Sequence, residues 1–191
     1  PPVYYPFFSV IKKTGRKLLT SALQLVEESY RMDFADLSQQ AVSARMLLFC
    51  SPHNPVGRVW SRSELERLLD IARQHRLIIV SDEIHADLIY PGNKHHILAS
   101  LAGSPESIIT AVAPSKTFNI PGLNLSALIV PDPAYRAAIR DRLEMMHVSA
   151  ANPFSVVAFE AAYRAGGEWL EALMTYLADT REMVRQYLAE Y

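Results

Sequence analysis

The sequence has one cysteine, no long apolar run and almost no net charge, and each shortage excludes a class of protein. The single cysteine, Cys50, excludes an internal disulfide and a cysteine-rich metal site. No apolar run reaches the ~18–20 residues that a membrane-spanning helix needs, and no secretory signal pattern opens the chain. A net charge of −1 does not indicate a polyanion partner, since a nucleic-acid binder usually has a basic face. We therefore expect a cytoplasmic protein with no membrane or nucleic-acid partner.

The sequence is rich enough in apolar residues to build a sizeable core. Half of its 191 residues are apolar and a fifth are charged, which is typical of a soluble globular domain. It begins with Pro1-Pro2 rather than methionine, and it stops at Tyr191 within a helical pattern. We therefore expect the sequence to be an internal fragment of a longer chain.

Short apolar runs alternate with helical patterns along the chain. Continuous apolar runs predict strands at 46–50, 77–80, 107–112 and 125–130, and a further strand is predicted at 16–25. Helices are predicted at 4–13, 33–42, 61–75, 133–146, 153–165 and 168–191. The strand, capped helix and strand between 46 and 80 form a βαβ crossover, which is right-handed in nearly all proteins. The fold class is therefore α/β, with a mostly parallel sheet flanked by helices.

Three polar residues follow three of the predicted strands. They are Asn54, Asp82 and Lys116, and in parallel sheets ligands bind outside the carboxyl ends of the strands. A lone loop lysine is usually a solvated surface residue. A lysine that meets a carboxylate and an amide at one sheet edge is better placed for chemistry, because its amine forms Schiff bases with carbonyl compounds.

Three motifs carry a resemblance to a known family. They are Ser-Pro-His-Asn-Pro-Val-Gly-Arg-Val-Trp at 51–60, Ser-Asp-Glu-Ile-His-Ala-Asp at 81–87 and Ser-Lys-Thr-Phe-Asn-Ile-Pro-Gly-Leu at 115–123. With them the chain resembles the fold-type I pyridoxal-phosphate enzymes of the aspartate aminotransferase superfamily. It is most similar to the MalY/PatB branch of cystathionine β-lyases, or cysteine C–S lyases.

The resemblance implies an architecture, a cofactor and an assembly. Residues 1–191 would be the central part of a PLP-dependent transferase-like large domain with three α/β/α layers. The helix at 168–191 would lead toward a small domain outside this sequence. The cofactor would be pyridoxal 5′-phosphate (PLP), the substrate a small amino acid, and the full-length protein a homodimer.

The resemblance also assigns roles to individual residues. Lys116 would hold the cofactor covalently and then move the proton taken from the substrate Cα. Asp82 would pair with the pyridinium nitrogen, so that the ring can accept electrons from Cα. Asn54 would donate a hydrogen bond to the phenolate oxygen, and Tyr4 would lie on the cofactor ring.

The remaining positions include departures from the aminotransferases. His85 stands where they usually have a tyrosine that donates to the phenolate oxygen, and this form is similar to the lyase branch; the alternative is a histidine with a local structural hydrogen bond. Ala113 replaces a serine or threonine that many members use for the cofactor phosphate. Asn124 stands about where aminotransferases often have an arginine for the same phosphate. Ser115 remains as the candidate hydroxyl.

The other titratable candidates carry no functional assignment. The remaining histidines are interpreted as surface or loop residues: His53, His75, His95, His96 and His147. No pair of them has a convincing metal-ligand spacing with a carboxylate, so we expect no metal. Cys50 is predicted to be a core residue.

Three functions are compatible with the sequence. The first is β-elimination on cystathionine or another cysteine S-conjugate, giving a thiol, pyruvate and ammonia. The second is a class I/II aminotransferase that moves an amino group to a 2-oxo acid. The third is a regulatory protein-binding relative or an inactive fragment. We expect the 191 residues alone to be inactive, because segments that the family uses for the phosphate and the substrate carboxylate are missing.

Overall fold

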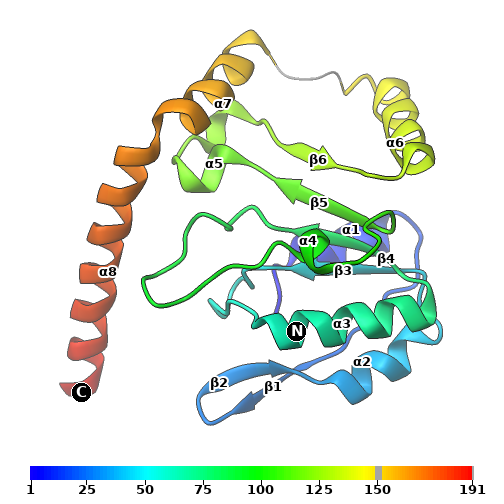
Figure 1. Cartoon of the computed structure of the whole chain (residues 1–191), viewed down its shortest axis with the longest axis horizontal. Coiled ribbons are helices and arrows are strands. Elements are labelled where there is room, and N and C mark those ends of the chain that lie inside the picture. The colour runs from blue at the N-terminus through cyan, green and yellow to red at the C-terminus, as the bar shows by residue number, and fades with distance from the viewer. Residues whose placement is uncertain (149–151, 191) are drawn as a thin grey trace.

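A four-stranded mixed sheet organises the structure, a computed structural model that describes residues 1–148 and 152–190. Its strands are β3 (Met46–Cys50), β4 (Ile78–Asp82), β5 (Ile108–Val112) and β6 (Ala127–Ile129). They lie side by side in chain order (Figure 1). β3, β4 and β5 are parallel, and β6 pairs antiparallel with β5. The α/β prediction is confirmed, with the antiparallel edge strand as the departure from a parallel sheet.

Helix α3 (Arg62–His75) makes the predicted crossover between β3 and β4. It begins at Ser61 with the predicted capping box, in which Ser61 and Glu64 satisfy each other's backbone N–H groups. Its leucines at 65, 68 and 69 are almost fully buried against strand residues such as Phe49 and Ile79. Burial of such a side chain contributes roughly 1.5–3 kcal/mol, so this helix and the sheet form the main core.

The segment before the sheet forms an antiparallel hairpin. The hairpin consists of β1 (Leu23–Val26) and β2 (Ser29–Met32). Its two turn residues, Glu27 and Glu28, have left-handed φ angles of 48° and 61°. The predicted strand at 16–25 is wrong over 16–22, which form neither strand nor helix, and the return strand was not predicted.

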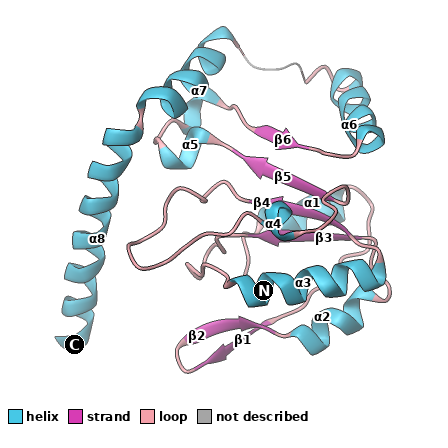
Figure 2. Ribbon diagram, in the orientation of Figure 1, coloured by secondary structure: helices cyan, strands magenta, loops and turns pink. Residues whose placement is uncertain are grey.

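The other helices are α1 (Pro6–Lys13), α2 (Phe34–Ala41), α4 (Leu98–Leu101), α5 (Pro114–Thr117), the 3₁₀ turn η1 (Pro121–Leu123), α6 (Pro133–Met145), α7 (Pro153–Ala165) and α8 (Gly167–Glu190). The helices predicted from the sequence are therefore confirmed to within a few residues at each end. Of these helices, α2 and α4 pack against the main core, whereas α8 follows α7 and stands apart from the sheet, as the cyan ribbons of Figure 2 show. Tyr191, the predicted end of the last helix, lies outside the described residues. None of the helices in the described ranges is both long and apolar enough to cross a membrane.

Candidate active site

The carboxyl ends of the parallel strands bring the predicted residues together. Asp82 ends β4 and is in register with Cys50 at the end of β3 and with Ala111 of β5. A cavity of about 110 Å³ opens at this edge. Its lining comprises Tyr4, Cys50, Asn54, Asp82, Ile84, His85 and Lys116. Five of the six predicted site residues therefore line one cavity, although they are spread over 113 positions of the chain.

Ser115 is the predicted site residue that the structure does not bring into this lining. It lies in α5, half-buried, and its carbonyl accepts a hydrogen bond from the Ile120 N–H at 3.2 Å. Its role toward a phosphate stays a prediction. At the other end of the chain, Tyr4 lines the cavity, whereas its neighbour Tyr5 is 76% exposed and does not.

Asp82 is a half-buried carboxyl group with few partners. Burial raises its pKa, and the Ile84 N–H, His85 and Lys116 oppose that rise. The Ile84 N–H donates to Oδ1 at 3.3 Å. Among the described residues, no arginine, lysine or histidine forms an ion pair with it. A carboxylate in this state is stabilised by a cationic ligand group placed against it.

His85 lies in the same cavity, three residues after Asp82. Burial lowers the pKa of its imidazole; Asp82 raises it and Lys116 lowers it further. The net lowering favours the neutral ring, which donates a hydrogen bond through one nitrogen and accepts through the other.

Cys50 is a lining residue that the sequence predicted only as core. It is 2% exposed, so the core prediction is confirmed, but its Sγ also organises the turn that carries Asn54. Sγ lies 3.2 Å from the Pro52 carbonyl and accepts from the Asn54 N–H at 3.4 Å. Burial raises the pKa of the thiol to about 11. The group is therefore a protonated thiol at neutral pH and not a nucleophile.

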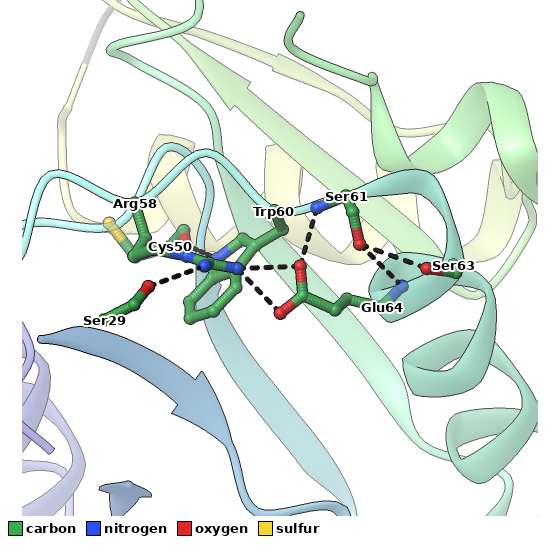
Figure 3. A network of polar contacts seen from close by, with 7 residues as sticks. All are labelled: Ser29, Cys50, Arg58, Trp60, Ser61, Ser63 and Glu64. Carbon is green, nitrogen blue, oxygen red and sulfur yellow. Dashed lines mark hydrogen bonds and ion pairs between the residues drawn. The ribbon is translucent and has the colours of Figure 1, made fainter. Parts of the chain in front are cut away.

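A partly buried ion pair holds the loop that follows Cys50 (Figure 3). Arg58 Nη2 donates to both carboxylate oxygens of Glu64 at 2.7 and 2.8 Å, and Nη1 donates to Ser29 Oγ at 3.0 Å. The Trp60 indole N–H donates to the Cys50 carbonyl at 3.1 Å. The loop is thus tied to the hairpin, to α3 and to the end of β3, which fixes the position of Asn54.

A second buried pair follows Asp82 directly. Glu83 is 2% exposed and accepts hydrogen bonds from Ser81 Oγ at 2.8 Å and from the Leu98 N–H at 3.2 Å. The His95 Nε2 lies 2.7 Å from the other Glu83 carboxylate oxygen. These contacts fasten both ends of the segment that contains His85.

The prediction that the remaining histidines are surface or loop residues is wrong for His75, which lies half-buried in α3, and two of the loop histidines are not surface residues. His95 and His53 lie outside helices and named strands, but the His95 side chain is only 8% exposed and His53 is 7% exposed. The His53 Nε2 lies 2.8 Å from the Pro2 carbonyl oxygen. Both rings are buried and make one polar contact each through Nε2, a placement that no local sequence pattern indicates.

The comparisons with known proteins agree with this geometry. The profile of the family described as "Aminotransferase class I and II" matches residues 1–191. Cystathionine beta-lyase PatB of Bacillus subtilis (strain 168) is 42% identical over 192 residues, which cover 99% of this chain and 50% of that protein. The chain thus spans about half the length of the curated relatives it matches.

Two solved structures share the fold closely. A PLP-bound putative aminotransferase from Clostridium difficile 630 is 40% identical with a TM-score of 0.97, over 99% of this chain and 49% of that one. A PLP-bound C–S lyase from Staphylococcus hominis is 34% identical with a TM-score of 0.90, over 98% and 47%. Because the family profile covers every residue of the sequence, the chain belongs to the aminotransferase class I and II family.

Proposed function

We propose that this protein is a PLP-dependent carbon–sulfur lyase that acts on cystathionine or another cysteine S-conjugate. The observation that carries the proposal is the convergence of Lys116, Asp82 and Asn54 on one cavity from the ends of three neighbouring strands. The names of relatives support it, since one is a cystathionine β-lyase and another a PLP-bound C–S lyase. In the full-length protein we propose that these residues form the central part of the large domain of a homodimer.

The residues at the cavity fit the cofactor chemically. When bound, PLP supplies an electron sink that stabilises negative charge at the substrate Cα. Asp82 would hold the proton on the ring nitrogen, because its half-buried carboxylate forms no ion pair with a cationic side chain among the described residues. Asn54 and His85 would donate hydrogen bonds to the ring oxygen, and Tyr4 would cover the ring face.

Lys116 would carry the proton steps. Its Nζ would anchor the cofactor, remove the Cα proton of the substrate and then return a proton to the sulfur as the Cβ–S bond breaks. Acid–base work by a positioned amine contributes about 10²–10⁴-fold to a rate. The overall change consumes one water and converts the S-conjugate to a thiol, pyruvate and ammonia.

Amino transfer to a 2-oxo acid is the second candidate. It uses the same lysine, aspartate and asparagine, and both the family description and the C. difficile relative name aminotransferases. His85 in place of the tyrosine of the aminotransferases favours elimination. The two reactions differ in product: elimination releases a thiol, whereas transfer leaves the Cβ–S bond intact.

The test is product analysis with the full-length protein, PLP and L-cystathionine. We expect equal amounts of thiol and pyruvate, and no requirement for a 2-oxo acid. Lys116→Ala should abolish both products and the absorbance of the covalently held cofactor, whereas Lys94→Ala, a control on an exposed loop, should change neither. Consumption of a 2-oxo acid without thiol release would overturn the lyase proposal in favour of transfer.

A further inference from the structure

A second, larger pocket adjoins the cofactor cavity. It has a volume of about 450 Å³, within the range of small-molecule sites. Asn54 and His85 line both spaces, so the larger pocket adjoins the cavity that contains Lys116. Its other walls come from the loop after β3, the segment that follows His85, and Arg181 of α8.

The charges around this pocket are all of one sign. Among the described residues no aspartate or glutamate lines it, whereas two arginines do. Arg58 is already neutralised by the bidentate contact with Glu64. Burial lowers the pKa values of His53 and His85, which favours neutral rings. Arg181 is therefore the arginine of this lining that forms no ion pair within the described chain, although the neighbouring Glu182 carboxylate interacts with it electrostatically.

The guanidinium of Arg181 is also held in place. Its Cζ lies 4.2 Å from the centroid of the Tyr90 ring, a cation–π contact. Stacking occupies the face of the guanidinium and leaves its N–H edges available, the geometry that binds a carboxylate with two hydrogen bonds. The next residue on the helix, Glu182, is paired with Arg185 at 2.7 Å.

We propose that Arg181 binds a carboxylate at the far end of the substrate side chain, so that this site selects cysteine S-conjugates with an anionic tail. Leu88, Val59 and the Tyr90 ring provide apolar wall for the chain between the sulfur and that carboxylate. The inference rests on the proposed lyase function, because it places the reacting sulfur near Lys116.

A matched pair of substrates tests this selectivity in the full-length protein with PLP. S-(2-carboxyethyl)-L-cysteine and S-propyl-L-cysteine have side chains of nearly equal length and differ in the terminal carboxylate. We expect the first to have the higher kcat/KM. Arg181→Gln should lower its kcat/KM about tenfold or more, mainly through KM, and change that of S-propyl-L-cysteine less than about twofold. Arg181→Lys keeps the positive charge but cannot donate two parallel hydrogen bonds to the carboxylate. Its kcat/KM for S-(2-carboxyethyl)-L-cysteine should therefore lie between those of wild type and Arg181→Gln.

The controls separate this inference from the function on which it rests. Arg185→Gln, one turn further along α8 and outside the pocket lining, should leave both substrates unchanged. If Arg181→Gln lowers kcat/KM equally for both substrates, or for neither, the inference is overturned and the lyase function is left intact. If neither substrate releases a thiol, turnover of L-cystathionine still tests the lyase function, and calorimetric binding of the same pair decides the tail site. If Arg181→Gln leaves the ratio of the two dissociation constants unchanged, the proposed carboxylate site at Arg181 is rejected.

Discussion

At the scale of single residues, the charge of Asp82 lowers the stability of the fold but is required for the proposed function. Burial disfavours its charged form, yet holding a proton on a cofactor nitrogen requires the carboxylate. A carboxyl with a raised folded-state pKa binds more protons when folded than when unfolded. The free energy of unfolding therefore falls as the pH rises from the pKa of Asp82 in the unfolded chain, near 3.8, through its pKa in the folded protein. The site thus holds an unfavourable charge that a cationic ligand would relieve.

We therefore predict opposite effects of Asp82→Asn on stability and on activity. Without cofactor, the variant should have a higher free energy of unfolding than wild type at pH 7, and the difference should disappear at acid pH, where wild-type Asp82 is also protonated. With PLP, kcat should fall by about 10²–10³-fold, as for loss of an electrostatic stabiliser at a reacting centre. Urea denaturation across pH and pyruvate release measure the two effects. Equal stability at pH 7 would show that Asp82 carries no burial penalty.

At the scale of elements, the loop between β3 and α3 depends on the Arg58–Glu64 pair. Glu64 serves two purposes, because it completes the capping box of α3 and neutralises an arginine whose side chain is 25% exposed. Removing one partner of a buried pair costs far more than removing a surface pair. This loop places Asn54 at the cavity, so its tether links helix capping to the site.

We predict that Glu64→Ala lowers the free energy of unfolding by about 2–4 kcal/mol, combining loss of the cap with an unpaired arginine. Glu66→Ala is the matched control: Glu66 pairs with Arg62 on the exposed face of the same helix, and its removal should cost no more than about 0.5 kcal/mol. Denaturant titration of both variants measures the contrast. Similar losses in the two would mean that the Arg58 contact does not stabilise the loop.

At the scale of the whole molecule, the chain has a built cavity but an incomplete set of charges for the cofactor. Lys116 is the only lysine or arginine among the described residues that line the cavity, and Ser115 lies outside that lining. Large apolar side chains are also exposed along α8: Tyr176 is 68% exposed, and Met183, two turns later on the same side of the helix, is 63% exposed. The surface of α8 is thus suited to contact with further protein.

We predict that the 191-residue chain alone binds PLP at least about tenfold more weakly than the full-length protein and releases no pyruvate from L-cystathionine. The physical reason is that no arginine, serine or threonine among the described residues lines the cavity, so the phosphate would lack these partners there. Fluorescence titration with PLP measures the affinity of both proteins. Turnover by the 191-residue chain at the full-length rate would refute the prediction.

The order of elements was predictable because it depends on local chemistry. The capping box at Ser61, the apolar runs of the central strands and the crossover between them all follow from residues close in sequence. The hairpin was missed for a local reason too. Both turn residues adopt left-handed φ angles, which usually call for asparagine or glycine, and here both are glutamates.

By itself, the sequence determined the fold class and which side chains lie at strand ends. The periodicity of apolar residues, the helix caps and the turn residues all depend on neighbours close in sequence. Only the tertiary structure decided which of them share a cavity. Tyr4 and Lys116 are 112 positions apart, yet both line it, whereas Ser115 next to Lys116 does not. Only the tertiary structure also shows that His95 contacts Glu83 in the interior and that Arg181 lies over the Tyr90 ring. Such pairings depend on how distant elements pack, which no local pattern encodes.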